Sequence, residues 1–227
     1  MKTLKVLAIN GSPRKLGNTQ QLVDALLEGA RQMGGDEVQV ETETAFVYDI
    51  PNIKGCVGCL GCKMNNPKTY GHCVRRDDMT PLIEKASAAD ALIFASPLYY
   101  LNLTGEMRCF IERLFYPYMT YEEGLKTVAP KRMPTAFIYT MNMTEQNWHE
   151  YGMEKAMGML EFFAERIFGK PERLAAYYTT QVADYSRYRL DIFPEEAKAA
   201  YKAAHWENDL VTAREIGKRL VTRALQR

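Results

Sequence analysis

The stretch Asn10-Gly11-Ser12-Pro13-Arg14-Lys15-Leu16-Gly17-Asn18-Thr19 joins an apolar segment, residues 4–9, to an amphipathic segment that begins near Thr19. Its glycines let the backbone approach an anion, and its hydroxyl and amide side chains can donate hydrogen bonds. The free N–H groups and the positive dipole end of a following helix would point into the same space, where Arg14 adds a fixed charge. The stretch therefore predicts a strand, a phosphate-binding loop and a helix, against the plainer alternative of a polar strand-to-helix turn.

The spacing of this loop separates it from two better-known phosphate loops. Five residues lie between Gly11 and Gly17, where a Walker A loop has four, and Asn18 stands where that loop has its lysine. The G-x-G-x-x-G pattern of dinucleotide-binding folds is also missing after the first apolar segment. ATP or GTP hydrolysis and a dinucleotide fingerprint are both disfavoured.

Composition and charge exclude several classes of partner. The 227 residues carry 29 Lys and Arg against 28 Asp and Glu, a formal charge of +1 that gives no general attraction to nucleic acid or to an anionic membrane. No segment approaches the roughly 18 apolar residues of a membrane span, and the first residues lack a signal-peptide pattern. We expect a cytoplasmic protein with one domain over residues 1–227.

The remaining pattern alternates strands with helices. Strands are expected at residues 4–9, 38–42, 91–95, 135–140 and 174–178, and the unbroken apolar run at 91–95 is typical of a parallel sheet covered on both faces. A cysteine-bearing loop is expected at 49–76, a helix capped by Asp78, a lid-like loop at 115–131 and a helical C-terminal extension at 194–227. This order predicts an α/β fold, a doubly wound five-stranded parallel sheet in the order 2-1-3-4-5 with helices on both faces.

Ligands of such sheets bind beyond the carboxyl ends of the strands, where the winding reverses. In this order that point lies between the first and third strands, which are followed by the polar loop at Gly11 and by Ser96-Pro97-Leu98-Tyr99-Tyr100-Leu101-Asn102. One site would therefore offer a phosphate loop on one side and an aromatic surface on the other. A planar, aromatic, phosphorylated ligand fits both.

Four motifs carry a family resemblance: Gly11-Ser12-Pro13-Arg14 with Gly17-Asn18-Thr19, Cys56-x-x-Cys59-x-x-Cys62, Asp77-Asp78-Met79 and Ser96-Pro97-Leu98-Tyr99. Together they resemble the NADPH-dependent FMN reductase and iron–sulfur flavoprotein branch of the flavodoxin-like superfamily. The resemblance implies FMN as cofactor, NAD(P)H as co-substrate and assembly as a homodimer or homotetramer. The flavin contacts that it implies are Ser12, Arg14, Asn18 and Thr19 at the phosphate, Pro97, Leu98, Tyr99, Tyr100 and Asn102 at the ring, and Thr140, Met141 and Asn142 in a third loop.

The cysteines leave three alternatives open. Cys56, Cys59 and Cys62 are spaced as in the compact motif of iron–sulfur flavoproteins, whereas Cys73 follows only after ten further residues. The thiols could bind a [4Fe-4S] cluster, bind zinc, or remain reduced in a loop beside the flavin.

The leading functional prediction is an FMN-dependent NAD(P)H oxidoreductase that reduces a small acceptor such as a quinone or a flavin. No side chain is assigned a catalytic role, because the flavin itself would carry the chemistry. The alternatives are an iron–sulfur flavoprotein that carries electrons and a non-enzymatic nucleotide-binding protein.

Overall fold

The computed structural model describes residues 1–124 and 126–227 and contains the predicted parallel sheet. Its parallel strands are β1 (Lys2–Asn10), β2 (Val38–Phe46), β3 (Ala91–Tyr99), β5 (Thr135–Thr140) and β6 (Glu172–Ala176). They lie in the order β2-β1-β3-β5-β6, so the predicted 2-1-3-4-5 order is confirmed. The difference in numbering comes from β4 (Asn102–Leu103), a short additional strand that pairs antiparallel with the end of β3.

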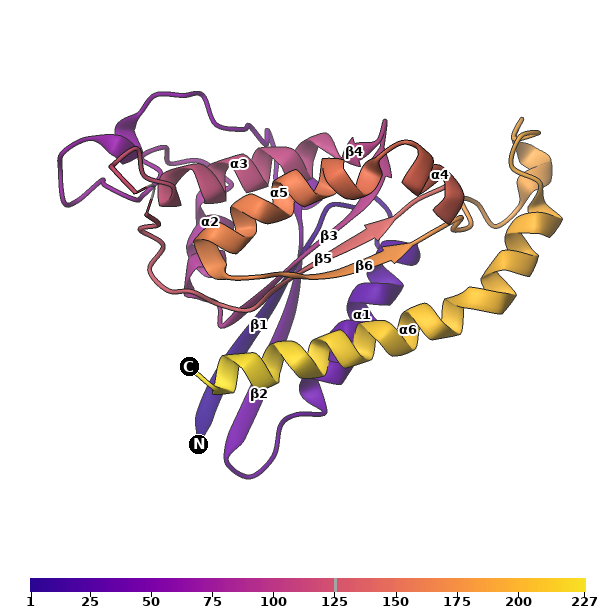
Figure 1. The fold of residues 1–227 in the computed structure, drawn as a ribbon, viewed down its shortest axis with the longest axis horizontal. Helices are drawn as coiled ribbons and strands as arrows, with labels where there is room; N and C mark the ends of the chain where they lie inside the picture. Colours follow the sequence, from indigo (N-terminus) through magenta and orange to yellow (C-terminus); the bar gives the residue numbers. More distant parts are fainter. Residues whose placement is uncertain (125) are drawn as a thin grey trace.

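Helices cover both faces of this sheet (Figure 1). One face carries α2 (Thr80–Ala88), α3 (Gly105–Tyr118) and α5 (Met153–Phe168), and the short α4 (Glu145–Glu150) leads into α5. The other face carries α1 (Asn18–Arg31) and α6 (Glu195–Leu225), the predicted C-terminal helix. The described residues also form the 3-10 turns η1 (Val47–Asp49), η2 (Gly61–Lys63) and η3 (Tyr185–Arg187). Among the described residues, no helix is both long and apolar enough to cross a membrane.

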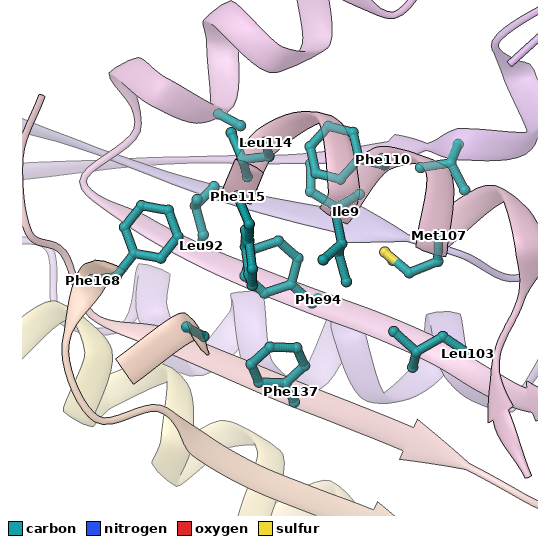
Figure 2. Close-up of a cluster of buried hydrophobic side chains, with 14 of the residues drawn as sticks. Ile9, Leu92, Phe94, Leu103, Met107, Phe110, Leu114, Phe115, Phe137 and Phe168 are labelled. Carbon is teal, nitrogen blue, oxygen red and sulfur yellow. The ribbon is translucent and has the colours of Figure 1, made fainter. Parts of the chain in front are cut away.

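The central strands bury both of their faces, because successive side chains point to opposite sides of a sheet. In β1, Leu7 and Ile9 join the core under α3 and α5, whereas Val6 and Ala8 join the core under α1 and α6. The first core is rich in aromatic rings, and Figure 2 shows Phe94 and Phe137 together in it. Their ring centroids are 5.0 Å apart and the rings are stacked. The unbroken apolar runs in the sequence thus correspond to strands that are covered on both sides.

Two glycines bring α1 and α6 into close contact. A Cβ atom at Gly29 would overlap the backbone of Arg214, and one at Gly217 would overlap the backbone of Leu26. Each glycine faces the other helix, so the two backbones approach more closely than side chains would allow. This contact fixes the C-terminal half of α6 against the sheet.

Two local expectations are wrong. The loop expected from residue 115 begins later, because α3 continues to Tyr118, and Phe115 and Tyr118 are both buried in the core. Pro117 lies inside the last turn, where it removes one i→i−4 hydrogen bond, and the helix ends one residue later. The expected cap at Asp78 is wrong too, because the N-cap position of α2 is Met79 and carries no side-chain cap; just before the helix, the Asp77 carboxylate accepts the Met79 N–H at 3.3 Å. Residue 125, within the expected lid-like loop, lies outside the described residues.

Candidate functional site

The polar loop at residues 11–17 lies between β1 and α1 and is fixed by buried hydrogen bonds. Asn10 is fully buried; its Oδ1 accepts the Ser12 N–H at 2.7 Å and its Nδ2 donates to Gln20 Oε1 at 2.7 Å. The loop also approaches α3 closely, since a Cβ atom at Gly11 would lie 2.8 Å from the Cβ of Met107. Only glycine fits at this position, so the start of the loop is defined by packing.

Two hydrogen bonds of Thr104 join this loop to the C-terminal end of β3. The Thr104 hydroxyl, at the start of α3, donates to the Gly11 carbonyl at 2.9 Å, and the Thr104 N–H donates to Ser96 Oγ at 3.2 Å. The two predicted sides of the ligand site are therefore neighbours at the carboxyl edge of the sheet. This is the juxtaposition that the predicted strand order requires.

A cleft of about 680 Å³ lies at this edge. It is lined by most of the predicted flavin contacts: Ser12, Arg14, Asn18, Thr19, Pro97, Leu98, Tyr99, Thr140, Met141 and Asn142. Volumes of 300–1,000 Å³ are typical of sites for small molecules and cofactors. The structure thus brings the three predicted loops around one cavity.

Two predicted contacts, Tyr100 and Asn102, do not line the cleft. Both belong to the β3–β4 hairpin, in which Leu98 pairs with Leu103 and Tyr99 pairs with Asn102. The turn residues Tyr100 and Leu101 have positive φ angles of 50° and 60°, as a two-residue hairpin turn requires. The Tyr100 side chain is fully exposed at the tip of the hairpin. The tight turn thus leaves both residues outside the lining of the cleft.

All four predicted phosphate contacts already have protein partners, and Ser12 Oγ accepts the Arg14 N–H at 3.1 Å. Arg14 donates to the Gln181 carbonyl, and Asn18 Nδ2 donates to the Thr180 carbonyl at 2.7 Å. The buried hydroxyl of Thr19 lies 2.8 Å from that of Thr140, so it joins the first loop to the third. Arg14 and Asn18 thus present their donors at the cleft, whereas Thr19 holds two of its walls together.

The sequence analysis missed one wall of the cleft. This wall consists of the segment after β6 together with the first turns of α6, and its residues are Thr179, Thr180, Gln181, Val182, Ala183, Tyr185, Glu195, Ala199 and Lys202. The segment is held against the third loop, because the Thr179 N–H donates to the Met141 carbonyl at 2.9 Å. A signal was available, since residues after the fifth parallel strand emerge at the same edge as those after the first and third.

A buried lysine stands behind this wall. Lys198 is fully buried, and its ammonium donates to the side chain of Asn142 and to the Thr179 carbonyl, the latter at 3.0 Å. Its Nζ also lies 4.0 Å from the centroid of the Tyr178 ring. Burial lowers the pKa of Lys198 from 10.5 to about 8.

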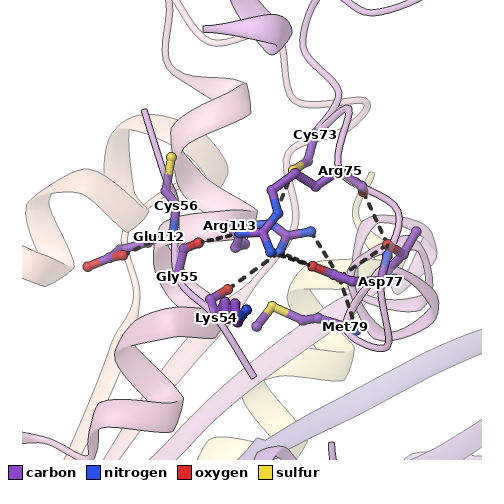
Figure 3. Close-up of polar contacts among 10 residues, drawn as sticks. Lys54, Gly55, Cys56, Cys73, Arg75, Asp77, Met79, Glu112 and Arg113 are labelled. Carbon is purple, nitrogen blue, oxygen red and sulfur yellow. Dashed lines mark hydrogen bonds and ion pairs between the residues drawn. The ribbon is translucent and has the colours of Figure 1, made fainter. Parts of the chain in front are cut away.

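The cysteine loop lies along the C-terminal half of α3, away from the cleft at the start of that helix (Figure 1). Arg113 of α3 is almost completely buried and organises the loop (Figure 3). Its Nε–H donates to Cys73 Sγ at 3.1 Å, and its two terminal nitrogens contact the Asp77 carboxylate at 2.8 and 3.2 Å. These bonds lower the pKa of Asp77. The cavity lined by these cysteines shares no residue with the cleft, and the expectation of thiols beside the flavin stays a prediction.

The four cysteines of this loop do not form a ready metal site. Cys56, Cys59, Cys62 and Cys73 line one cavity, but its volume is about 20 Å³, close to that needed for one water molecule. Within residues 1–124 and 126–227, no three His, Cys, Asp or Glu side chains are arranged to hold a metal ion. Burial also raises the pKa of the Cys62 thiol. In this conformation the residues do not fit a [4Fe-4S] cluster.

Comparison with known proteins places the chain among flavin reductases. An iron-sulfur flavoprotein of Archaeoglobus fulgidus is 38% identical over 115 residues, which are 51% of this chain and 47% of that protein, so the chain spans about half the length of this relative. Solved structures share the fold. An NAD(P)H:quinone oxidoreductase from Methanothermobacter marburgensis superposes with a TM-score of 0.63 at 17% identity, covering 96% of this chain and 97% of that one.

A second solved structure is an FMN-dependent NADH-azoreductase of Bacillus anthracis in complex with FMN. It matches with a TM-score of 0.60 at 11% identity and covers 97% of this chain and 100% of that one. At these identities the two structures show a common fold only. The family model described as NADPH-dependent FMN reductase, in contrast, matches the sequence itself over residues 4–160. Because this match covers well over half of the chain, the protein belongs to the NADPH-dependent FMN reductase family.

Proposed function

We propose that the protein is an FMN-dependent NAD(P)H oxidoreductase that passes electrons from a reduced nicotinamide to a small acceptor such as a quinone or a flavin. The observation that carries this proposal is the cleft of about 680 Å³ between the polar loop after β1 and the aromatic strip at the end of β3, which consists of residues 97–99. Family membership and the FMN-containing relative of the same fold support the choice of cofactor. FMN, when bound, supplies hydride acceptance from NAD(P)H and onward electron transfer.

The residues of the cleft have distinct tasks in this proposal. Arg14 and Asn18 hold the phosphate, using N–H groups that the structure shows donating to the carbonyls of residues 180 and 181. The phosphate would replace neutral carbonyl acceptors with charged ones, which form stronger hydrogen bonds. Pro97, Leu98 and Tyr99 offer an apolar and aromatic surface to the flavin ring. The third loop, with Asn142, provides polar contacts beside that surface.

Titration of the FMN-free protein with FMN, followed by the quenching of FMN fluorescence, tests the cofactor assignment. We expect Arg14→Ala to weaken FMN binding about tenfold or more, because it removes a charged hydrogen bond to the phosphate. Arg31→Ala is the matched control, since Arg31 lies at the far end of α1 and contacts Thr42. Equal FMN affinities for Arg14→Ala and the wild type would refute the assignment.

Steady-state oxidation of NADH or NADPH with a quinone or with free FMN as acceptor tests the reaction. Turnover that depends on both bound FMN and acceptor supports an oxidoreductase. Protein that binds FMN but oxidises neither nicotinamide would instead support the non-enzymatic nucleotide-binding alternative.

We also propose assembly as a homodimer or homotetramer, for which the exposed apolar side chains of α5 offer a surface.

An iron–sulfur electron carrier is the second candidate function. One observation favours it, namely that the four cysteines of residues 56–73 line a common cavity. The volume of that cavity requires the loop to open before a cluster could enter. Iron and sulfide analysis after anaerobic purification separates the two functions: near-stoichiometric iron and sulfide support the carrier, and iron-free protein supports the oxidoreductase without a cluster.

A further inference from the structure

The N-terminal half of α6 is attached to the rest of the protein by an unusual anchor. Across residues 195–212, Lys198 is the only side chain that is buried. This part of α6 also extends beyond the sheet (Figure 1). A helix segment of this kind normally docks through an apolar stripe. Here Trp206 and Leu210 pack against the core while only partly buried, and the fully buried side chain is the charged Lys198. The contacts of that charge therefore help to decide how the wall of the cleft is held.

The ammonium of Lys198 is bound by neutral oxygens. It donates to Oδ1 and to the carbonyl of Asn142 and to the carbonyl of Thr179, and Tyr178 and Phe193 place their rings 4.0 and 5.2 Å from it. Among the described residues, no carboxylate lies within ion-pair distance of this ammonium. Its charge is therefore uncompensated by any acidic side chain and is directed at the third loop.

These contacts determine the orientation of the Asn142 carboxamide. A lysine ammonium can only donate, so the carboxamide atom that faces it must be the oxygen. The NH2 group then lies on the opposite side of the carboxamide and is free to donate elsewhere. Because Asn142 lines the cleft, a ligand atom that accepts a hydrogen bond is the suitable partner for this group.

We propose that Lys198 is a positioning residue of the cleft, which ties α6 to the third loop and fixes Asn142 so that its NH2 group is offered to an acceptor edge of the ligand. The inference rests on the proposed FMN site, where a carbonyl-bearing edge of the flavin ring has the required chemistry. Lys198 itself lies behind the wall and acts through Asn142. The long α6 is thereby part of the binding site as well as part of the fold.

A double-mutant cycle on FMN affinity tests this inference, with Lys198→Met, Asn142→Ala and the double variant titrated as FMN-free proteins. We expect each single variant to bind FMN about tenfold more weakly. The double variant should bind no more weakly than the worse single variant, because Lys198 acts through Asn142. Lys218→Met is the matched control on the same helix, since Lys218 pairs with Glu215 at the surface.

Asn142→Asp separates positioning from packing, because aspartate keeps an acceptor for Lys198 but loses the NH2 donor. We expect its FMN affinity to fall while its stability to urea is retained. Lys198→Gln replaces Lys198→Met in the cycle if the methionine variant does not fold. The inference is overturned if the two losses of FMN affinity multiply in the double variant, or if Lys198→Met binds FMN as tightly as the wild type. Either result leaves the proposed function intact. Wild-type protein that does not bind FMN overturns both.

Discussion

Replacing Lys198 with methionine should change how the stability of the protein depends on pH. The pKa of Lys198 is lowered from 10.5 to about 8, and at about 1.36 kcal/mol per pKa unit the buried charge costs about 3 kcal/mol relative to the neutral amine. In the unfolded chain the amine regains its ordinary pKa. Between pH 8 and 10.5 the unfolded chain therefore binds more protons than the folded chain, and the free energy of unfolding rises with pH across this window.

Urea denaturation at pH 7 and pH 10 measures this effect in the wild type and in Lys198→Met. The methionine variant lacks the titrating group. From pH 7 to pH 10, the free energy of unfolding of the wild type should therefore rise by about 2 kcal/mol relative to that of the variant. Tyrosines whose pKa is raised by burial, such as Tyr177 and Tyr201, titrate in both proteins and cancel in the difference. Lys218→Met should follow the wild-type profile. Parallel profiles for the wild type and Lys198→Met would refute the assignment of a buried, uncompensated charge.

Three further changes test the packing, the cysteine loop and the assembly. Gly29→Ala should lower the free energy of unfolding by about 2 kcal/mol, because its methyl group overlaps the Arg214 backbone; an unchanged urea midpoint would contradict the close helix contact. Arg113→Met should lower the free energy of unfolding by about 3 kcal/mol in the same assay, because it leaves the Asp77 carboxylate without its bidentate partner. Wild-type stability of this variant would contradict a structural role for Arg113. Phe162→Glu, on the exposed face of α5, should reduce the mass found by sedimentation equilibrium if α5 forms the subunit interface.

The sheet is predictable from the sequence because its central strands are short apolar runs bounded by polar turns. The segment at residues 91–95 has no polar residue, which only a strand covered on both faces tolerates. Once the strand order is known, the segments at the carboxyl ends of β1 and β3 must lie together, because these neighbouring parallel strands end at the same edge of the sheet. The errors are local: the end of α3 depends on burial of Phe115 and Tyr118, which helix periodicity alone does not reveal.

The rest of the site depends on contacts between residues distant in sequence. Thr180 and Gln181 reach the cleft because Asn18 and Arg14, more than 160 residues earlier, donate to their carbonyls. Lys198 reads in the sequence as one of several charged residues of a surface helix, and only the fold shows that it is buried. Likewise, the spacing of the cysteines does not predict that Cys73 accepts a hydrogen bond from Arg113 of α3, away from the cleft.

The two sides of the cleft come from different parts of the chain. The phosphate loop, the aromatic strip and the third loop all lie within the segment that matches the family, whereas the wall formed by residues 179–202 lies beyond it. Because these loops match the family of FMN reductases, we expect them to bind the cofactor of that family. In the proposed function this wall faces the cofactor, so we expect differences in acceptor between members to lie in this segment. Lys198 connects the two parts, because it reaches from the unmatched helix to the matched loop.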